Sequence, residues 1–222
     1  MKRRTLLAAL PLTALITLTA CGPSVTGEDA DTTKKAEEVS ARFGNVPTTL
    51  DLLVDFRCPH CKDLHESLRK RFRDGINNGE FSLRVFARPM LDLAEGRKGH
   101  TQFSTLTASA FYDLYDKDQK LAWTWMEKAM SLQPDNPAVA EAGPSEIAEA
   151  LRQIGAPESV TANVTNAKVN PAVNKVEKYI SDRWGDQGTP ILIHNDKIIN
   201  ENIDSIDKKA LIEAINKAVK KS

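Results

Sequence analysis

The sequence predicts an α/β fold in which a long helical segment interrupts a set of strands. An apolar run over residues 48–56 leads directly into a helical pattern, and a second run, alternating in polarity, follows at 81–87. Between 92 and 184 the apolar residues recur at helical spacing, and strand patterns return only after 184. With 222 residues, 41% of them hydrophobic, the chain is long enough for one domain with such an insertion.

The N-terminal end has the pattern of a targeting segment. Basic residues at positions 2–4 precede a short apolar run, which is too short for a comfortable membrane span. Leu18-Thr19-Ala20-Cys21 resembles a bacterial lipoprotein cleavage box, in which the Cys becomes the lipidated first residue of the mature chain. We therefore expect a signal peptide over 1–20 and a lipid on Cys21. The alternative is an ordinary secretory peptide with an incidental Cys.

The next segment is polar and has no apolar period up to about residue 40. We expect a flexible tether that holds the domain off the membrane, and assign 21–44 to the lipidated N-terminus and this tether. For its last part, 34–43, we expect either a short helix or the approach to the first strand.

Charge and cysteine usage narrow the function classes. The chain has 30 basic and 30 acidic residues, and removing the first twenty positions takes away three basic residues and no acidic one. The chain therefore lacks the excess of basic residues that would indicate a nucleic-acid partner. The three cysteines are Cys21, Cys58 and Cys61, so with Cys21 blocked the folded part holds one dithiol pair and no spare thiol. This usage suits an exported redox protein.

The dithiol is predicted to lie at the start of a helix. Cys58 follows the first apolar run, and Pro59 stands in the first turn, where a missing N–H costs nothing. A thiol there faces unpaired backbone N–H groups and the positive end of the helix dipole, and both favour thiolate. Cys61 is about one turn away, close enough for a small disulfide. Cys58 is thus the expected attacking sulfur and Cys61 the resolving one.

Other uses of this Cys pair are weaker hypotheses. A structural disulfide is one alternative. A zinc site would need more thiolates or imidazoles at ligand spacing, and only His65 lies four residues beyond Cys61. Attached c-type haem requires His directly after the second Cys, where this chain has Lys62. We expect neither a metal nor a cofactor.

The two strand-forming parts flank the insertion. Within 45–91 the order strand, helix, strand predicts a βαβ unit with parallel strands, its helix ending near Gly75. The segment 92–184 is assigned to the helical insertion, whose aromatic residues we expect to pack a core rather than line a peptide groove. In 185–222 we expect a strand, a hairpin turn at 194–197 and a C-terminal helix that starts at Asp207.

Taken together, these features resemble the thioredoxin fold, and specifically the DsbA-like thiol–disulfide oxidoreductases, which carry a helical insertion in that fold. Cys58-Pro59-His60-Cys61 has the dipeptide typical of DsbA, and Thr189-Pro190 ahead of a strand resembles the cis-proline loop of the family. The resemblance covers about residues 45 to 220. Thr189 stands where well-known DsbA proteins usually have Val, and Asp55 matches an Asp-x-x-Cys pattern of membrane-bound relatives. We identify no Glu at the strand position of the family's buried acid.

The resemblance implies a reaction and a set of residue roles. Oxidised Cys58–Cys61 would be attacked by a thiolate of an unfolded exported protein, forming a mixed disulfide at Cys58 that a second substrate thiolate resolves. His60 lies in the first helical turn, where it can donate to the Cys58 sulfur or act on it as a cation. Thr189 and Pro190 would present a backbone edge to which an extended substrate can add as a strand.

The partners and location follow from the same resemblance. We expect substrates with free thiols, a monomeric enzyme anchored by its lipid on the extracytoplasmic side of the cell membrane, and a quinone-linked reoxidase of the DsbB-like or VKOR-like kind. No nucleic acid is expected. Three alternatives stay open: an electron-fed reductase or isomerase of the same fold, a non-enzymatic peptide-holding lipoprotein chaperone, and a metal-binding lipoprotein.

Overall fold

One mixed sheet forms the centre of the molecule. A computed structural model describes residues 30–94, 102–134, 141–200 and 207–220. Within these residues the strand order is β1-β3-β2-β4-β5. The strands are β1 (Ala41–Phe43), β2 (Thr49–Val54), β3 (Ser82–Ala87), β4 (Ile191–His194) and β5 (Lys197–Ile198). The predicted signal peptide and the lipidation site Cys21 lie outside the described residues.

The predicted βαβ unit is confirmed. β2 leads through α2 (Pro59–Asn77) into β3, and the two strands pair in parallel with Leu52 opposite Val85. β4 pairs antiparallel with β2, with Leu192 opposite Leu52, and β5 completes a hairpin with β4. Because β2 is central, its residues are buried on both faces, which agrees with the nearly continuous apolar run in the sequence.

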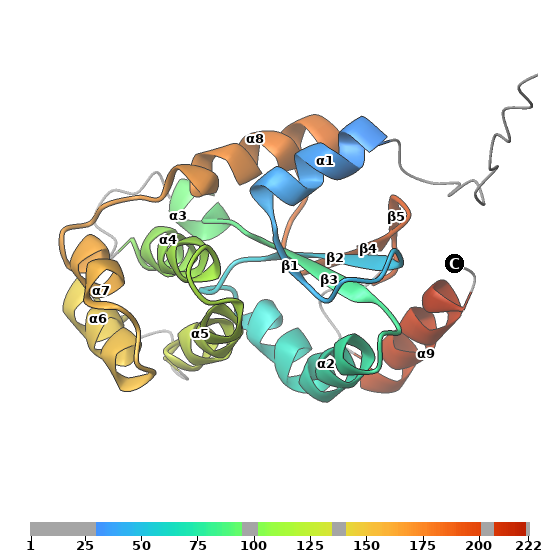
Figure 1. Ribbon diagram of the computed structural model, residues 1–222, viewed down its shortest axis with the longest axis horizontal. Coiled ribbons are helices and arrows are strands. Elements are labelled where there is room, and N and C mark those ends of the chain that lie inside the picture. Colours follow the sequence, from blue (N-terminus) through green and yellow to red (C-terminus); the bar gives the residue numbers. More distant parts are fainter. Residues whose placement is uncertain (1–29, 95–101, 135–140, 201–206, 221–222) are drawn as a thin grey trace, which may run out of the picture.

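Helices cover both faces of the sheet (Figure 1). α1 (Ala30–Val39) and α8 (Pro171–Trp184) lie together on one face, and α2 and α9 (Lys208–Val219) lie on the other. Phe86 of β3 contacts the α8 side through a stacked Tyr179 ring at 5.6 Å and an edge-on Trp184 ring at 5.4 Å. Aromatic pairs of this geometry add to the area that each ring buries, so α8 is held firmly on the sheet.

The predicted presence of a helical insertion is confirmed, and its first helix begins at Met90, just before the assigned boundary at 92. It contains α3 (Met90–Ala94), α4 (Phe103–Tyr115), α5 (Gln119–Ser131), α6 (Pro144–Gln153), α7 (Glu158–Thr165) and α8. α4 is its central helix, buried along almost its whole length, and the rings of Phe111 and Trp125 are fully buried. These aromatic residues therefore pack a core, as predicted.

Two tyrosines join this insertion to the backbone of the sheet. The Tyr115 hydroxyl accepts from the N–H of Arg42 in the edge strand β1 and donates to the carbonyl of the same residue, both at 2.9 Å. The Tyr112 hydroxyl does the same for Ala87 at the end of β3, at 3.0 and 3.2 Å. Each hydroxyl thus satisfies one donor and one acceptor of the strand backbone. These backbone groups would otherwise need a partner such as a neighbouring strand, and here α4 supplies it.

Two boundaries differ from the sequence analysis. The segment 30–43 lies within the assigned tether, for whose last part, 34–43, we expected either a short helix or the approach to the first strand; it forms α1 and β1, and β1 pairs antiparallel with β3. α2 continues through Gly75 to Asn77 instead of ending near Gly75. This glycine is needed for a close approach, because a Cβ at position 75 would lie 2.2 Å from Cε1 of Phe81. It is therefore a packing residue and not a helix terminator.

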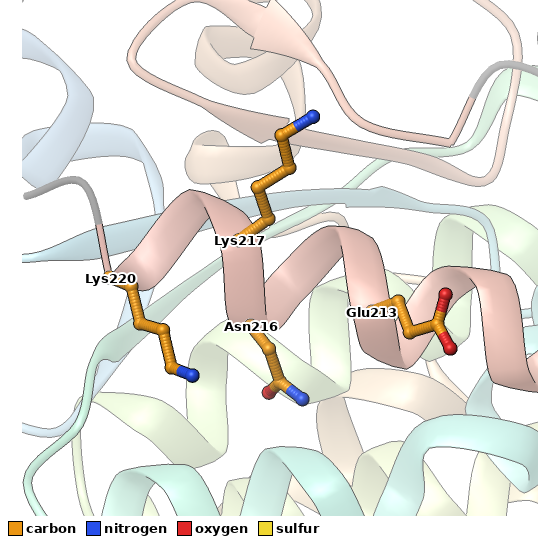
Figure 2. A pocket seen from close by; sticks show the side chains of 4 residues that line it. All are labelled: Glu213, Asn216, Lys217 and Lys220. Carbon is orange, nitrogen blue, oxygen red and sulfur yellow. The ribbon is translucent and has the colours of Figure 1, made fainter.

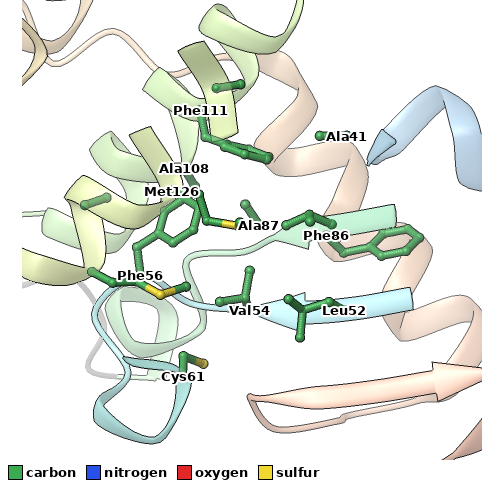
Figure 3. Close-up of a cluster of buried hydrophobic side chains, with 14 of the residues drawn as sticks. Ala41, Leu52, Val54, Phe56, Cys61, Phe86, Ala87, Ala108, Phe111 and Met126 are labelled. Atoms are coloured by element: carbon green, nitrogen blue, oxygen red, sulfur yellow. The ribbon is translucent and has the colours of Figure 1, made fainter. Parts of the chain in front are cut away.

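The C-terminal part follows the prediction. The turn between β4 and β5 has Asn195 and Asp196 at positive φ, and Asp207 caps α9 by accepting from the N–H groups of Lys209 and Ala210. The buried core runs from this part of the sheet to the start of α2. Figure 3 shows Cys61 at one end of the cluster that contains Val54 and Phe56.

Candidate active site

Cys58 occupies the N-cap of α2, as its position before Pro59 predicted. Its backbone is extended, with φ −71° and ψ 121°, and Pro59 takes the first helical position. The Cys58 carbonyl accepts from the N–H groups of Cys61 and Lys62 at 3.0 and 3.2 Å, which starts the helix. The N–H of Cys58 donates to the carbonyl of Asp55 at 3.0 Å, so a tight turn carries the chain from β2 into α2. The sulfur therefore lies at the positive end of the helix dipole.

The surroundings of Cys58 stabilise its thiolate. Both sulfurs are present as free thiols and both residues are buried, Cys58 5% exposed and Cys61 1%. The Cys61 thiol donates to the Cys58 sulfur and is the largest cause that lowers the pKa of Cys58, from 9.0 to about 6, against the opposing effect of burial. The backbone N–H of Cys61, the Thr189 hydroxyl and the backbone N–H of His60 lower it further. At pH 7 a thiol with this pKa is about nine tenths ionised.

Cys61 has the opposite character. Its complete burial and the adjacent Cys58 raise its pKa well above 9.0. One sulfur of the pair is thus ready to act as a nucleophile and leaving group, while the other stays protonated and shielded. This asymmetry supports the predicted assignment of Cys58 as the attacking and Cys61 as the resolving sulfur.

His60 stabilises the Cys58 thiolate through its backbone N–H. The residue is exposed, and its N–H is the group that lowers the pKa of Cys58. The predicted action of the imidazole on the sulfur stays a prediction.

The Thr189–Pro190 loop lies directly against the dithiol. Its peptide bond is cis, as the resemblance to the DsbA-like family implied. The Cys58 thiol donates to the carbonyl of Thr189, with a sulfur–oxygen distance of 3.4 Å. Asn200, 4% exposed, fixes this loop, because its amide donates to the carbonyl of Pro190 at 2.8 Å and its oxygen accepts from the N–H of Leu192 at 2.6 Å.

A buried carboxyl stands at the end of β2. Asp55 is 0% exposed and accepts from the N–H groups of Arg57 and Leu91 at 2.8 and 2.9 Å. Burial raises its pKa from 3.8 to about 7, although these donors and the nearby Ser104 hydroxyl oppose the rise, and Asp92 adds to it. The sequence has no Glu within this strand. The buried acid Asp55 lies just after the strand, and the apolar residues on either side of it, Val54 and Phe56, were the sequence signal for its burial.

Other contacts to the loop that bears Cys58 had no sequence signal. Arg57 forms an ion pair with Glu141 and lies 3.9 Å from a carboxylate oxygen of the buried Asp92. Gln133 donates to two backbone carbonyls of the loop. All three partners belong to the helical insertion and are distant in sequence, so only the fold brings them to the dithiol.

Surface hollows lie elsewhere on the molecule. One, of about 430 Å³, is lined by Glu213, Asn216, Lys217 and Lys220 along α9 and lacks the groups of the dithiol site (Figure 2). Among the described residues no cluster of three or more His, Cys, Asp or Glu side chains has the arrangement of a metal site. In the same part of the chain, no helix is both long and apolar enough to span a membrane.

Comparison with known proteins agrees with this geometry. A family model described as thioredoxin matches residues 44–214, which include the dithiol, the insertion and the cis-proline loop. The chain belongs to the thioredoxin family. A search of curated proteins returns no significant match.

Solved structures confirm the predicted thioredoxin fold with a helical insertion. Oxidised BdbD from Bacillus subtilis aligns with this thioredoxin-family chain at a TM-score of 0.63 and 24% identity, covering 82% of this chain and 94% of BdbD. MdbA from Corynebacterium diphtheriae, described as a thiol-disulfide oxidoreductase, aligns at 0.60 and 18%, covering 85% and 92%. The thiol-disulfide exchange protein alpha-DsbA2 from Wolbachia pipientis aligns at 0.55 and 17%, covering 82% and 97%.

Proposed function

We propose that this protein is an extracytoplasmic thiol–disulfide oxidoreductase that donates its Cys58–Cys61 disulfide to exported proteins during oxidative folding. The observation that carries the proposal is the asymmetry of the two sulfurs. Cys58 has its pKa lowered to about 6 at the N-cap of α2, whereas Cys61 is fully buried with its pKa raised. The structural likeness to MdbA, described as a thiol-disulfide oxidoreductase, supports the same class of chemistry.

The reaction proceeds by two exchanges. A substrate thiolate attacks Cys58 of the oxidised pair, the Cys58–Cys61 bond breaks, and Cys61 leaves and takes a proton. A second substrate thiolate then attacks the substrate sulfur of the mixed disulfide, and Cys58 leaves as a thiolate. The substrate loses two electrons and two protons and gains a disulfide, while the enzyme dithiol gains the two electrons. A stable Cys58 thiolate favours this direction because it is the better leaving group.

The cis-proline loop would hold the substrate beside the sulfur. The carbonyl of Thr189 lies 3.4 Å from the Cys58 sulfur, so a chain that pairs with the backbone at Thr189 brings its own cysteine to Cys58. We assign substrate binding to Thr189 and Pro190 on this ground.

Location and partners complete the proposal. The lipoprotein-like segment ending at Cys21 supports an anchor on the outer side of the cell membrane, and a structural neighbour from Salmonella enterica is described as a periplasmic thioredoxin-like protein. Each catalytic cycle leaves the dithiol reduced, so an oxidant must restore the disulfide; from the resemblance we propose a quinone-linked membrane enzyme of the DsbB-like or VKOR-like kind.

The redox equilibrium of Cys58–Cys61 with glutathione tests the direction. The chain without residues 1–21 suits this experiment, because it retains every described residue. A reduction potential more oxidising than about −180 mV supports a disulfide donor, and a value near about −270 mV assigns the protein to electron-fed reductases instead. A Cys58→Ser variant that still holds unfolded protein as well as the wild type would favour the chaperone alternative.

A further inference from the structure

One side chain of the helical insertion contacts the backbone of the loop that carries Cys58 at two points. The Nε2 atom of Gln133 donates to the carbonyl of Phe56 at 2.7 Å and to the carbonyl of Cys58 at 3.2 Å. Gln133 follows the C-cap residue of α5 and is 9% exposed. An amide nitrogen has two hydrogens, and here each of them has an acceptor. The helical insertion therefore supplies a two-point contact to the active-site backbone.

These two carbonyls determine how the turn is oriented. They belong to the Phe56–Arg57 and Cys58–Pro59 peptide groups, so a single amide fixes the backbone before and after the Arg57–Cys58 pair. The Cys58 carbonyl is also the oxygen that accepts from the N–H groups of Cys61 and Lys62 and so begins α2. Because the direction of this carbonyl defines ψ of Cys58, Gln133 constrains the residue that bears the attacking sulfur.

The neighbours of the sulfur depend on the same turn. The N–H groups of His60 and Cys61 reach the Cys58 sulfur only when residues 58–61 hold their helical start, and the sulfur contacts the Thr189 carbonyl at 3.4 Å. We propose that Gln133 is a positioning residue for disulfide exchange, which holds the Cys58 turn so that these N–H groups and the cis-proline loop face the sulfur. This role rests on the proposed function only in that the exchange passes through Cys58.

Substitutions at position 133 separate positioning from simple support of the fold. Gln133→Met keeps the length of the side chain and removes both donors, and Gln133→Asn keeps the amide but shortens its reach, so it can serve as the milder variant if Gln133→Met does not fold. Gln153→Met, on the exposed side of α6, is the matched control. Each is made in the chain without residues 1–21, and the readouts are the thiolate titration of reduced Cys58, the equilibrium constant with glutathione and the free energy of unfolding.

The expected result is a change in sulfur chemistry in a folded protein. In Gln133→Met the Cys58 pKa rises by about one unit, and at pH 7 the glutathione equilibrium shifts about fivefold towards the protein disulfide. Gln133→Asn shifts both in the same direction by less, and Gln153→Met shifts neither. Variants that lose stability but titrate and equilibrate as the wild type does would overturn the proposal. A wild-type potential near about −270 mV would instead contradict the oxidase function. The differences in Cys58 pKa and glutathione equilibrium between the variants would then still decide the role of Gln133.

Discussion

Replacing Cys61 tests the main cause of thiolate stability at Cys58. The structure lowers the Cys58 pKa by about three units, from 9.0 to about 6, and the Cys61 thiol is the largest contributor. Three units correspond to about 4 kcal/mol of differential stabilisation of the thiolate. A hydrogen bond to a charged group contributes about 1.5–3 kcal/mol, so removing this donor should raise the Cys58 pKa by about one to two units.

Two variants isolate the donor. Cys61→Ala removes it and should move the Cys58 pKa to about 7–8, whereas Cys61→Ser keeps an O–H in nearly the same place and should stay near 6. In the chain without residues 1–21 each variant has Cys58 as its only thiol. The ultraviolet absorbance of the thiolate, followed against pH, therefore reports on one group.

The outcomes are distinct. If Cys61→Ala titrates near 6 as Cys61→Ser does, the backbone N–H groups and the helix dipole alone stabilise the thiolate, and the reasoning is refuted. If both variants rise by the same amount, the packing of the sulfur rather than its donated proton is responsible. Only a rise in Cys61→Ala that Cys61→Ser does not share agrees with the contact described here.

Three further predictions concern the framework around the dithiol. The pKa of Asp55 is raised to about 7 in the fold. The stability due to this group is therefore fully present below about pH 4 and is lost as the pH rises through about 7. The free energy of unfolding, measured with denaturant between about pH 5 and 8, should show this decline in the wild type and a smaller decline in Asp55→Asn. Tyr112→Phe and Tyr115→Phe each leave a strand N–H and C=O without the hydroxyl and should lower the free energy of unfolding by about 1–3 kcal/mol, more for the buried Tyr112; wild-type stability in either variant would contradict a stabilising role for these hydroxyl contacts. Gly75→Ala brings a Cβ to 2.2 Å from the Phe81 ring and should cost about 1–3 kcal/mol, with an unchanged denaturation midpoint showing that the ring can move away.

Local sequence was enough to predict the parts of the site that are local in space. The helix start at Cys58 follows from an apolar run, a thiol and a proline in succession, and the structure places Pro59 at the first helical position. The Thr189–Pro190 loop was identified from its resemblance to the cis-proline loop of DsbA-like proteins, and its peptide bond is cis. Both features are patterns of neighbouring residues, the first read from physical chemistry and the second from the resemblance.

Features that depend on tertiary pairing were missed for a physical reason. β1 has three residues, too few to show a period, and its place in the sheet depends on β3 and on the hydroxyl of Tyr115. Asn200 and Gln133 are single polar residues. The partners of Asn200 lie 8 and 10 positions away, and those of Gln133 lie 75 and 77 positions away. A buried amide of this kind looks in sequence like any exposed one, because its hydrogen-bond partners are backbone groups of no particular residue type.

The active-site turn is held from three separate parts of the fold. Asp55 connects it to the start of α3, Gln133 connects it to the end of α5, and the cis-proline loop contacts the sulfur itself. Two of these contacts come from the helical insertion, so the insertion shapes the environment of the thiolate as well as adding buried surface. A substitution in the insertion can therefore change the redox equilibrium without touching either cysteine, and stability and thiolate pKa should be measured together for every variant there.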